Sequence, residues 1–84
     1  MTQIWYVYMI RTTKNQLYTG ITTDIERRFK EHCSQGPKAA KFFRGRPPKE
    51  IVFQESHPNR SCASKREAQI KKLTRTQKNL LIKK

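Results

Sequence analysis

The stretch IWYVYMIRTTKNQLYTGIT, residues 4–22, decides the fold of this chain. Residues 4–11 are rich in β-branched and aromatic side chains, a composition that favours a β-strand. Residues 12–16, TTKNQ, are polar and predict a turn, and residues 17–22 predict a second strand. Because the turn is short, we expect the two strands to pair as an antiparallel hairpin.

Side chains alternate between the two faces of a strand, and this sorts the aromatic residues of the hairpin. The first strand has two sets, Tyr6, Tyr8 and Ile10 on one face and Trp5, Val7 and Met9 on the other. Pairing can then bring Tyr8 and Tyr18 to the same face. Gly20 interrupts the second strand beside Tyr18, and a glycine there usually marks close approach by a backbone or a ligand.

A helix is predicted over residues 24–34. Thr23 and Glu26 have the spacing of a capping box, and Asp24 adds a negative charge to the first turn. Gly36 supplies a stop signal.

The buried face of this helix is expected to carry Ile25, Phe29 and Cys33, which recur every fourth residue. Arg28 and His32 each precede one of these residues, so they lie about 100° round the helix, at the edge of that face. Two such polar residues beside a buried stripe make this edge a candidate functional site.

The remaining elements complete one small α+β domain. A basic loop, residues 36–49, holds two of the three glycines and three of the four prolines. A third strand is predicted at 50–56, followed by helices at 61–73 and 75–82. The order β-β-α-β-α-α over residues 1–84 predicts a single domain with a three-stranded antiparallel sheet flanked by helices.

The charge of the chain indicates a polyanionic partner. Its 84 residues include 19 basic and 6 acidic side chains, a net charge of +13. Fourteen of the basic residues but only three acidic ones fall in residues 38–84. Such an excess attracts polyanions, so we expect a nucleic acid, DNA in the first place, as the partner. An anionic membrane surface and a basic surface without a partner are the alternatives.

Other classes of protein have little support in the sequence. No apolar run approaches the ~20 residues that a membrane span needs, and the N-terminus is aromatic rather than a Lys-led signal peptide. Cys33 and Cys62 are too few for a disulfide scaffold, so we expect free thiols and a cytoplasmic location. Together with His32 and His57 they lack the paired spacing of a zinc site.

The second predicted helix adds a carboxylate to the candidate site. Glu67 is four residues after Ala63 and three before Ile70, so it borders an apolar stripe. Five polar residues could therefore converge at one edge of the sheet: Tyr8, Tyr18, Arg28, His32 and Glu67.

Each of these residues also has a purely structural interpretation. The two tyrosines can be core aromatics whose hydroxyls reach solvent. Arg28 can extend over a neighbouring ring, and His32 can complement the negative end of its helix. Glu67 can belong to a capping box begun at Ser64 or pair with Lys71 four residues on. Since all five positions would prefer apolar side chains, coincidence is the weaker explanation of the set.

The spacing of these residues resembles the signature of the GIY-YIG endonuclease family. Tyr6-Val7-Tyr8 is followed, ten residues on, by Tyr18-Thr19-Gly20, then by Arg28 and His32, and Glu67 on a later helix completes the set. The segments LYTGITTDIERR, FFRGR and KREAQIKKLTRTQK are similar to the small, single-domain YhbQ-like branch of that family. The resemblance spans nearly the whole chain and implies the GIY-YIG fold. The first motif departs from Gly-Ile-Tyr, and Asn79 is the one candidate for the late asparagine of many members.

The resemblance implies hydrolysis of a phosphodiester with a single Mg²⁺ or Mn²⁺ ion. Tyr8 would be the base, and Arg28, His32 and the metal would supply the positive charge that favours its ionisation. His32 could instead relay the proton. Arg28 would hold the scissile phosphate through its planar fork, and Tyr18 would hydrogen-bond a phosphate oxygen or the water. Glu67 would be the metal ligand, since one carboxylate is enough for octahedral Mg²⁺.

The basic loop would hold the nucleic-acid backbone. Its cationic side chains can contact phosphates: Lys38, Lys41, Arg44, Arg46 and Lys49. Phe42 and Phe43 could stack on an unpaired base or pack inward, and inward packing is expected of one of them. No segment predicts a base-specific recognition helix, so selectivity would come from DNA structure or from a partner protein.

Two functions remain in competition. The first is a structure- or single-strand-selective nuclease that acts in DNA repair or maintenance. The second is a nucleic-acid-binding module of the same fold with little activity, and a protein partner with an acidic face is a third, weaker alternative. Only the nuclease predicts Mg²⁺-dependent cleavage that disappears when Glu67 or Arg28 is replaced while binding persists.

Overall fold

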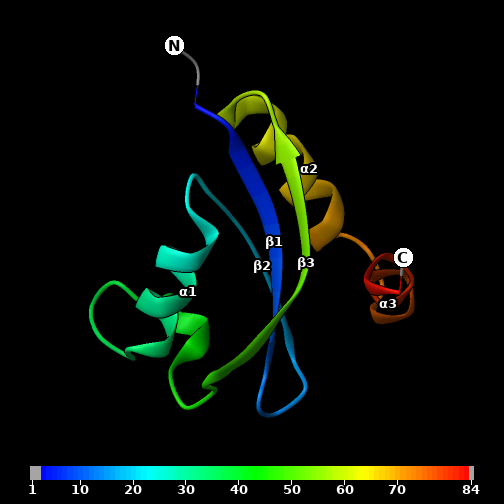
Figure 1. Cartoon of the computed structure of the whole chain (residues 1–84). Helices are drawn as coiled ribbons and strands as arrows, with labels where there is room; N and C mark the ends of the chain where they lie inside the picture. The colour runs from blue at the N-terminus through cyan, green and yellow to red at the C-terminus, as the bar shows by residue number, and fades with distance from the viewer. Residues whose placement is uncertain (1–2, 84) are drawn as a thin grey trace.

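A three-stranded antiparallel sheet forms the middle layer of the computed structural model, which describes residues 3–83 (Figure 1). Its strands are β1 (Trp5–Thr12), β2 (Leu17–Thr22) and β3 (Pro48–His57), in the order β2-β1-β3. β1 is therefore the central strand, and each of its neighbours has one free edge. The three-stranded antiparallel sheet predicted from the sequence is confirmed.

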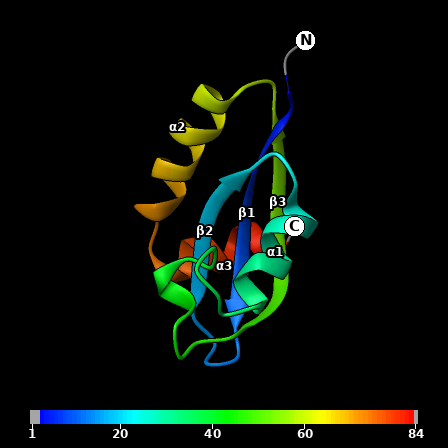
Figure 2. The same cartoon turned by 90° about the vertical axis from the view of Figure 1, so that its left-hand side faces the viewer.

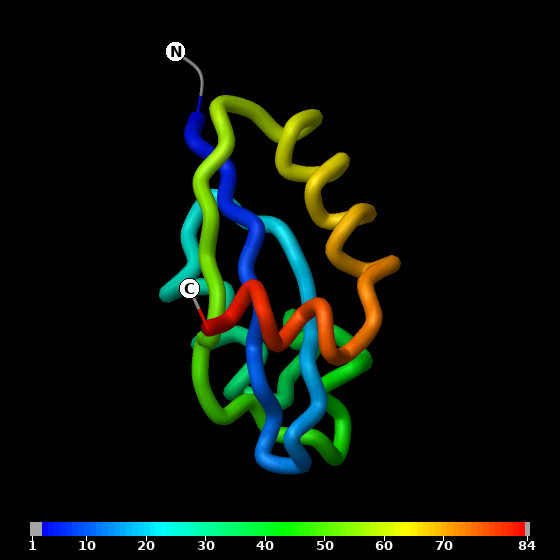
Figure 3. Tube along the Cα trace, turned by 90° about the vertical axis from the view of Figure 1, so that its right-hand side faces the viewer, coloured from blue at the N-terminus to red at the C-terminus, as the bar shows by residue number. Residues whose placement is uncertain are grey.

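Helices cover both faces of this sheet (Figures 1 and 2). One face carries α1 (Ile25–Cys33) and the 3₁₀ turn η1 (Lys41–Phe43), and the other carries α2 (Arg60–Lys71) and α3 (Arg75–Ile82). In Figure 3 α3 lies across the strands while α2 runs beside β2. The α+β class and the order β-β-α-β-α-α are confirmed, with η1 as a short addition in the basic loop.

The central strand supplies both halves of the core. Val7 and Met9 are fully buried on the face covered by α2 and α3, where Ala63 and Ile70 join them. On the opposite face Tyr8 and Ile10 are buried together with Phe43 of η1. The alternation predicted for residues 5–10 is thus the actual division between the two hydrophobic layers.

The register of the hairpin follows from this alternation. Tyr8 is paired with Gly20, and Ile10 is paired with Tyr18. Tyr8 and Tyr18 therefore share the face covered by α1, as expected, with ring centroids 6.2 Å apart. Thr12 closes the turn, because its Oγ1 accepts the backbone N–H groups of Lys14 and Gln16.

The start of α1 differs from the predicted capping box. The N-cap is Asp24, whose carboxylate accepts the backbone N–H of Arg27 at 3.1 Å, and not Thr23. Thr22 Oγ1 accepts the Asp24 N–H at 3.2 Å, which holds Asp24 in the extended conformation that a cap requires. The predicted stop is also displaced, since Gln35 rather than Gly36 has the positive φ, 57°.

The buried face of α1 differs from the expected one as well. His32 is fully buried, whereas Cys33, which was assigned to the core stripe, is exposed. Seven residues of an α-helix turn through nearly two full circles, so His32 lies within about 20° of Ile25, while Cys33 is about 80° away. The histidine is therefore part of the core face and not of its edge.

The later elements begin at side-chain caps. The side chain of Asn59 accepts the Cys62 N–H at 2.9 Å and starts α2 one residue before the predicted position. Thr74 and Gln77 form a capping box that starts α3. β3 is longer than the predicted 50–56. Within residues 3–83 no helix has the length and apolar character needed to cross a membrane.

Replacement of Asp24 tests the assignment of the cap. Asp24→Ala should lower the free energy of unfolding by about 1 kcal/mol, because the Arg27 N–H loses its acceptor. Thr23→Ala is the matched control and should have a smaller effect. Urea denaturation measures both, and an equal or larger loss in Thr23→Ala would contradict the assignment.

Candidate functional site

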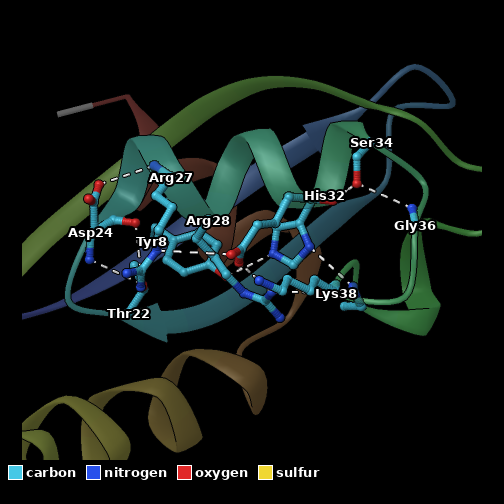
Figure 4. Close-up of polar contacts among 11 residues, drawn as sticks. Tyr8, Thr22, Asp24, Arg27, Arg28, His32, Ser34, Gly36 and Lys38 are labelled. Carbon is cyan, nitrogen blue, oxygen red and sulfur yellow. Dashed lines mark hydrogen bonds and ion pairs between the residues drawn. The ribbon is translucent and has the colours of Figure 1, made fainter.

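The hydroxyl of Tyr8 is the centre of the candidate site. Tyr8 is only 1% exposed, and its Oη lies 3.1 Å from Nε2 of His32. Figure 4 shows the two rings together under α1, with the Arg28 side chain beside them. A buried hydroxyl requires a hydrogen-bond partner, and α1 supplies it through the histidine on its core face.

Gly20 makes room for this hydroxyl from the neighbouring strand. A Cβ at residue 20 would lie 2.6 Å from Tyr8 Oη and 3.0 Å from Cε2 of Tyr18. The first distance is one that real Cβ atoms essentially never show, and the second is tighter than most Cβ contacts. The glycine in the interior of β2 thus marks the close approach of a side chain, where the sequence suggested a backbone or a ligand.

The proton on His32 can be assigned from its two neighbours. The backbone N–H of Ala40 donates to Nδ1 at 3.2 Å, so Nδ1 carries no proton. The neutral ring then carries its proton on Nε2 and donates it to Tyr8 Oη. Burial, reinforced by the charge of Arg28, lowers the pKa of His32 to about 4. At neutral pH His32 is therefore an uncharged hydrogen-bond donor.

The charge state of Tyr8 follows from the same surroundings. Burial raises the pKa of Tyr8 above its usual range. The charges of Tyr18 and, more weakly, Glu67 raise this pKa further, whereas Arg28 lowers it. The phenol is thus protonated in the free protein. The expectation that His32 would supply positive charge to Tyr8 was wrong, because the buried ring stays neutral. Arg28 remains as the cation beside the hydroxyl.

Arg28 is held in place by two acceptors. Its Nη1 donates to Oε1 of Glu31 at 3.0 Å and to the backbone oxygen of Lys38 at 2.6 Å. Burial disfavours the charge, but Glu31 and Tyr8 outweigh it and raise the pKa of the Arg28 guanidinium. Both bonds use Nη1, so the guanidinium is anchored at one nitrogen. Its planar fork is a group that can bind the oxygens of a phosphate.

Two features of this arrangement were missed at the level of sequence. Glu31, which was not among the candidate site residues, is half-buried and pairs with Arg28. The i, i+3 spacing of the two residues could have revealed this pair. The backbone groups of Lys38 and Ala40 carry no signal in their residue types.

Aromatic rings extend the site from Tyr18 towards the basic loop. The Tyr18 ring lies 5.4 Å from His32, 4.8 Å from Phe43 and 5.4 Å from Phe42, measured between centroids. Phe43 is fully buried and Phe42 is half-buried. Inward packing of one of the two phenylalanines is confirmed.

Glu67 belongs to α2, on the opposite face of the sheet from α1. It lies on α2, half-buried between Ala63 and Ile70, and its carboxylate is 3.4 Å from Nζ of Lys71. The pairing with Lys71 that the sequence offered as an alternative is therefore present. No hydrogen bond or ion pair joins Glu67 to Tyr8, Tyr18, Arg28 or His32, and its charge raises the pKa of Tyr8 only weakly. Asn79 lies on α3 and accepts a hydrogen bond from Arg75.

The donor set suits a hard divalent cation better than zinc. Among residues 3–83 no group of three or more His, Cys, Asp and Glu side chains could hold a metal ion. Mg²⁺ keeps several waters and commonly takes one or two carboxylates together with phosphate oxygens of the substrate. Glu67 offers one such carboxylate, whereas that of Glu31 is already paired with Arg28.

The cations of the basic loop differ in their freedom. Lys38, Lys41, Arg44 and Lys49 are exposed, and none of them takes part in an ion pair within residues 3–83. Arg46 is half-buried, with its guanidinium over the ring of Phe42. The loop contacts the site through its backbone, because the Lys38 oxygen accepts from Arg28 and the Ala40 N–H donates to His32.

Comparison with known proteins gives consistent similarities. A family model described as the GIY-YIG catalytic domain matches residues 4–80. The UPF0213 protein YhbQ of Escherichia coli K12 is 46% identical over 78 residues, which are 93% of this chain and 76% of that protein. The UPF0213 protein of Citrobacter koseri is 47% identical over the same shares.

A solved structure extends the similarity to the fold. The solution NMR structure of the UPF0213 protein BH0048 from Bacillus halodurans matches with a TM-score of 0.60 at 38% identity. The match covers 95% of this chain and 83% of that one.

The neutral state of His32 can be tested through the pH dependence of stability. Between about pH 6.5 and pH 4 the unfolded chain binds a proton at His32 that the folded chain does not, so stability should fall as the pH falls. One such group contributes at most about 1.4 kcal/mol per pH unit. Urea denaturation across this range should show a shallower slope for His32→Gln, whose side chain cannot titrate.

Ring ¹⁵N chemical shifts of His32 provide a second readout of the same assignment. We expect the proton on Nε2 throughout the neutral range. A proton on Nδ1, or identical slopes for the parent chain and His32→Gln, would contradict it.

Proposed function

This chain belongs to the GIY-YIG catalytic domain family, and we propose that it is a metal-dependent endonuclease that hydrolyses phosphodiester bonds in DNA. The observation that carries the proposal is the buried Tyr8 hydroxyl, which accepts a hydrogen bond from neutral His32 and lies beside the cationic Arg28. Any buried tyrosine hydroxyl needs a hydrogen-bond partner, but the cation beside this one also favours its ionised form, and this supports a chemical role.

Arg28 is the proposed phosphate-binding residue. Glu31 and Lys38 fix one end of its guanidinium, so the remaining donors are oriented before the substrate arrives. A fixed fork loses little entropy when it binds two phosphate oxygens, and its charge stabilises the additional negative charge of the transition state. Tyr18, on the same face of the sheet, would hydrogen-bond a phosphate oxygen or the attacking water.

Tyr8 is the proposed base, assisted by His32. Ionising a tyrosine of ordinary pKa at pH 7.5 costs about 3.4 kcal/mol, and burial adds to that cost. Arg28 offsets part of it by charge, and the Nε2–H of His32 donates to the phenolate. His32 is poorly suited to relay the proton itself, because Nε2 already carries one and Nδ1 faces the Ala40 N–H.

Glu67 is the proposed ligand of the divalent cation, which when bound would supply further positive charge at the phosphoryl oxygens. The influence of its charge on the pKa of Tyr8 supports this role. To bind a cation the carboxylate must exchange its half-exposed ion pair with Lys71, a contact of small stabilising effect.

The substrate class is proposed from the basic loop. Its free cations, Lys38, Lys41, Arg44 and Lys49, would contact the backbone and favour a polyanion without reading its sequence. We therefore propose selectivity for DNA structure and a role in DNA repair or maintenance. Two free cysteines and the reducing environment they suit support a cytoplasmic location.

Two observations favour the alternative of a binding module with little activity. Burial holds Tyr8 in its protonated form, and Glu67 is paired with a lysine. Both features would slow the chemical step while leaving the basic loop intact. Binding would then show the salt dependence of phosphate contacts without cleavage.

Replacement of Tyr8 tests the proposed base. The parent chain should cut labelled single-stranded, duplex, nicked or branched DNA with Mg²⁺ or Mn²⁺, and Tyr8→Phe should cut at least about 100-fold more slowly. Tyr6→Phe, the same change two residues away on the same face, is the control and should retain the parent rate. Equal rates for Tyr8→Phe and the parent chain would exclude Tyr8 as the base.

Replacement of Glu67 separates the nuclease from the binding module. Glu67→Gln should lose Mg²⁺-dependent cleavage and keep its affinity for DNA in a gel-shift assay, whereas Glu26→Gln, on the exposed side of α1, should keep both. If neither the parent chain nor Glu67→Gln cuts any of these substrates while both bind, the binding module is the correct function.

A further inference from the structure

The half-buried Phe42 lies at the end of a line of rings that starts at the proposed base. Tyr8 and Tyr18 are 6.2 Å apart and Tyr18 and Phe42 are 5.4 Å apart, measured between ring centroids. The Phe43 ring packs against the Phe42 ring, with the centroids 5.4 Å apart and the two ring planes nearly perpendicular. Phe43 is fully buried in the core, so the ring against which Phe42 packs is fixed in position.

Arg46 is fixed over Phe42 by the fold of the loop. Its guanidinium carbon lies 5.3 Å from the centroid of the Phe42 ring, and its Nη1 donates to the backbone oxygen of Phe42 at 3.2 Å. Gly45 has a φ of 69°, and this left-handed residue turns the chain so that Arg46 returns over the ring. The other loop cations are exposed, so Arg46 differs from them in being both planar and immobilised.

We propose that Phe42 and Arg46 form a stacking subsite for one unpaired base of the strand whose phosphate Arg28 binds. This inference rests on the proposed function and names its substrate class, which is DNA with a single-stranded segment at the cleavage site. The subsite and Arg28 belong to one unit, because the loop between them is bonded to the site through Lys38 and Ala40.

The chemistry of the pair favours a base over a phosphate. Aromatic rings and the plane of an arginine both stack on nucleobases, irrespective of the base. An arginine that binds a phosphate extends its fork towards the oxygens, but the hydrogen bond to the Phe42 backbone holds the Arg46 guanidinium near the Phe42 ring, where both groups can contact one base. A base within a duplex is already stacked on both sides, so only an unpaired base can use this surface.

A fluorescence titration tests the subsite. The probe is a single-stranded oligonucleotide with 2-aminopurine at one position, moved along the strand in a series and titrated with Glu67→Gln protein in Mg²⁺ buffer so that no cleavage occurs. Stacking quenches 2-aminopurine, so we expect strong quenching at one position of the series. Adding Phe42→Leu or Arg46→Lys to this protein should abolish that quenching.

The same variants should weaken single-stranded binding more than duplex binding. Loss of one stacked base, worth about 1–3 kcal/mol, corresponds to a loss of about 5- to 150-fold in affinity for single strands. The matched controls are Phe53→Leu and Arg60→Lys. Phe53 packs against the core on the other face of the sheet, and the guanidinium carbon of Arg60 lies 5.5 Å from the centroid of the Trp5 ring. They should leave the quenching unchanged.

Two results would overturn the subsite. One is the absence of quenching at every position of the series. The other is an equal loss of affinity for single strands and duplex in Arg46→Lys, a variant that keeps the charge and so leaves general phosphate binding in place. Because the titration measures binding, it gives an answer whether or not the parent chain cleaves DNA, and failure of the proposed function would show separately in the cleavage assay.

Discussion

The burial of one hydroxyl group, that of Tyr8, constrains much of this structure. Tyr8 lies on the central strand, so helices cover both faces around it, and its oxygen must find a partner inside the protein. His32 provides that partner from the core face of α1, and Gly20 provides the space from β2. The hydroxyl of a residue on the hydrophobic central strand is thereby hydrogen-bonded inside the core.

The basic loop also orients residues of the candidate site through its backbone. The Ala40 N–H fixes the tautomer of His32, and the Lys38 carbonyl fixes one end of Arg28. Both contacts come from the backbone, so the loop can vary its side chains while it keeps the two site residues oriented. A nucleic acid bound by the loop cations would therefore lie close to Arg28 and the Tyr8 hydroxyl.

Much of the fold could be predicted because apolar residues recur every second residue along a strand and every 3.6 residues along a helix. Alternation in β1 gave the two faces of the sheet, and Gly20 beside Tyr18 marked the close approach. Strict counting by fours failed in α1, where the drift of the helix brings His32 and not Cys33 to the core. The neutrality of His32 could not be predicted at all, since it depends on burial and on a backbone donor eight residues along the chain.

The measurement that tests this account most directly is DNA cleavage by Gly20→Ala, with folding checked by circular dichroism. This variant keeps every proposed site residue and adds one methyl group, which would lie 2.6 Å from the Tyr8 oxygen, so the Tyr8 ring or β2 must shift and we expect the hydrogen bond to His32 to be lost. If the Tyr8 hydroxyl is the base, a folded Gly20→Ala protein binds DNA and cuts it far more slowly than the parent chain. Cleavage at the parent rate by the folded variant would contradict the central role of Tyr8.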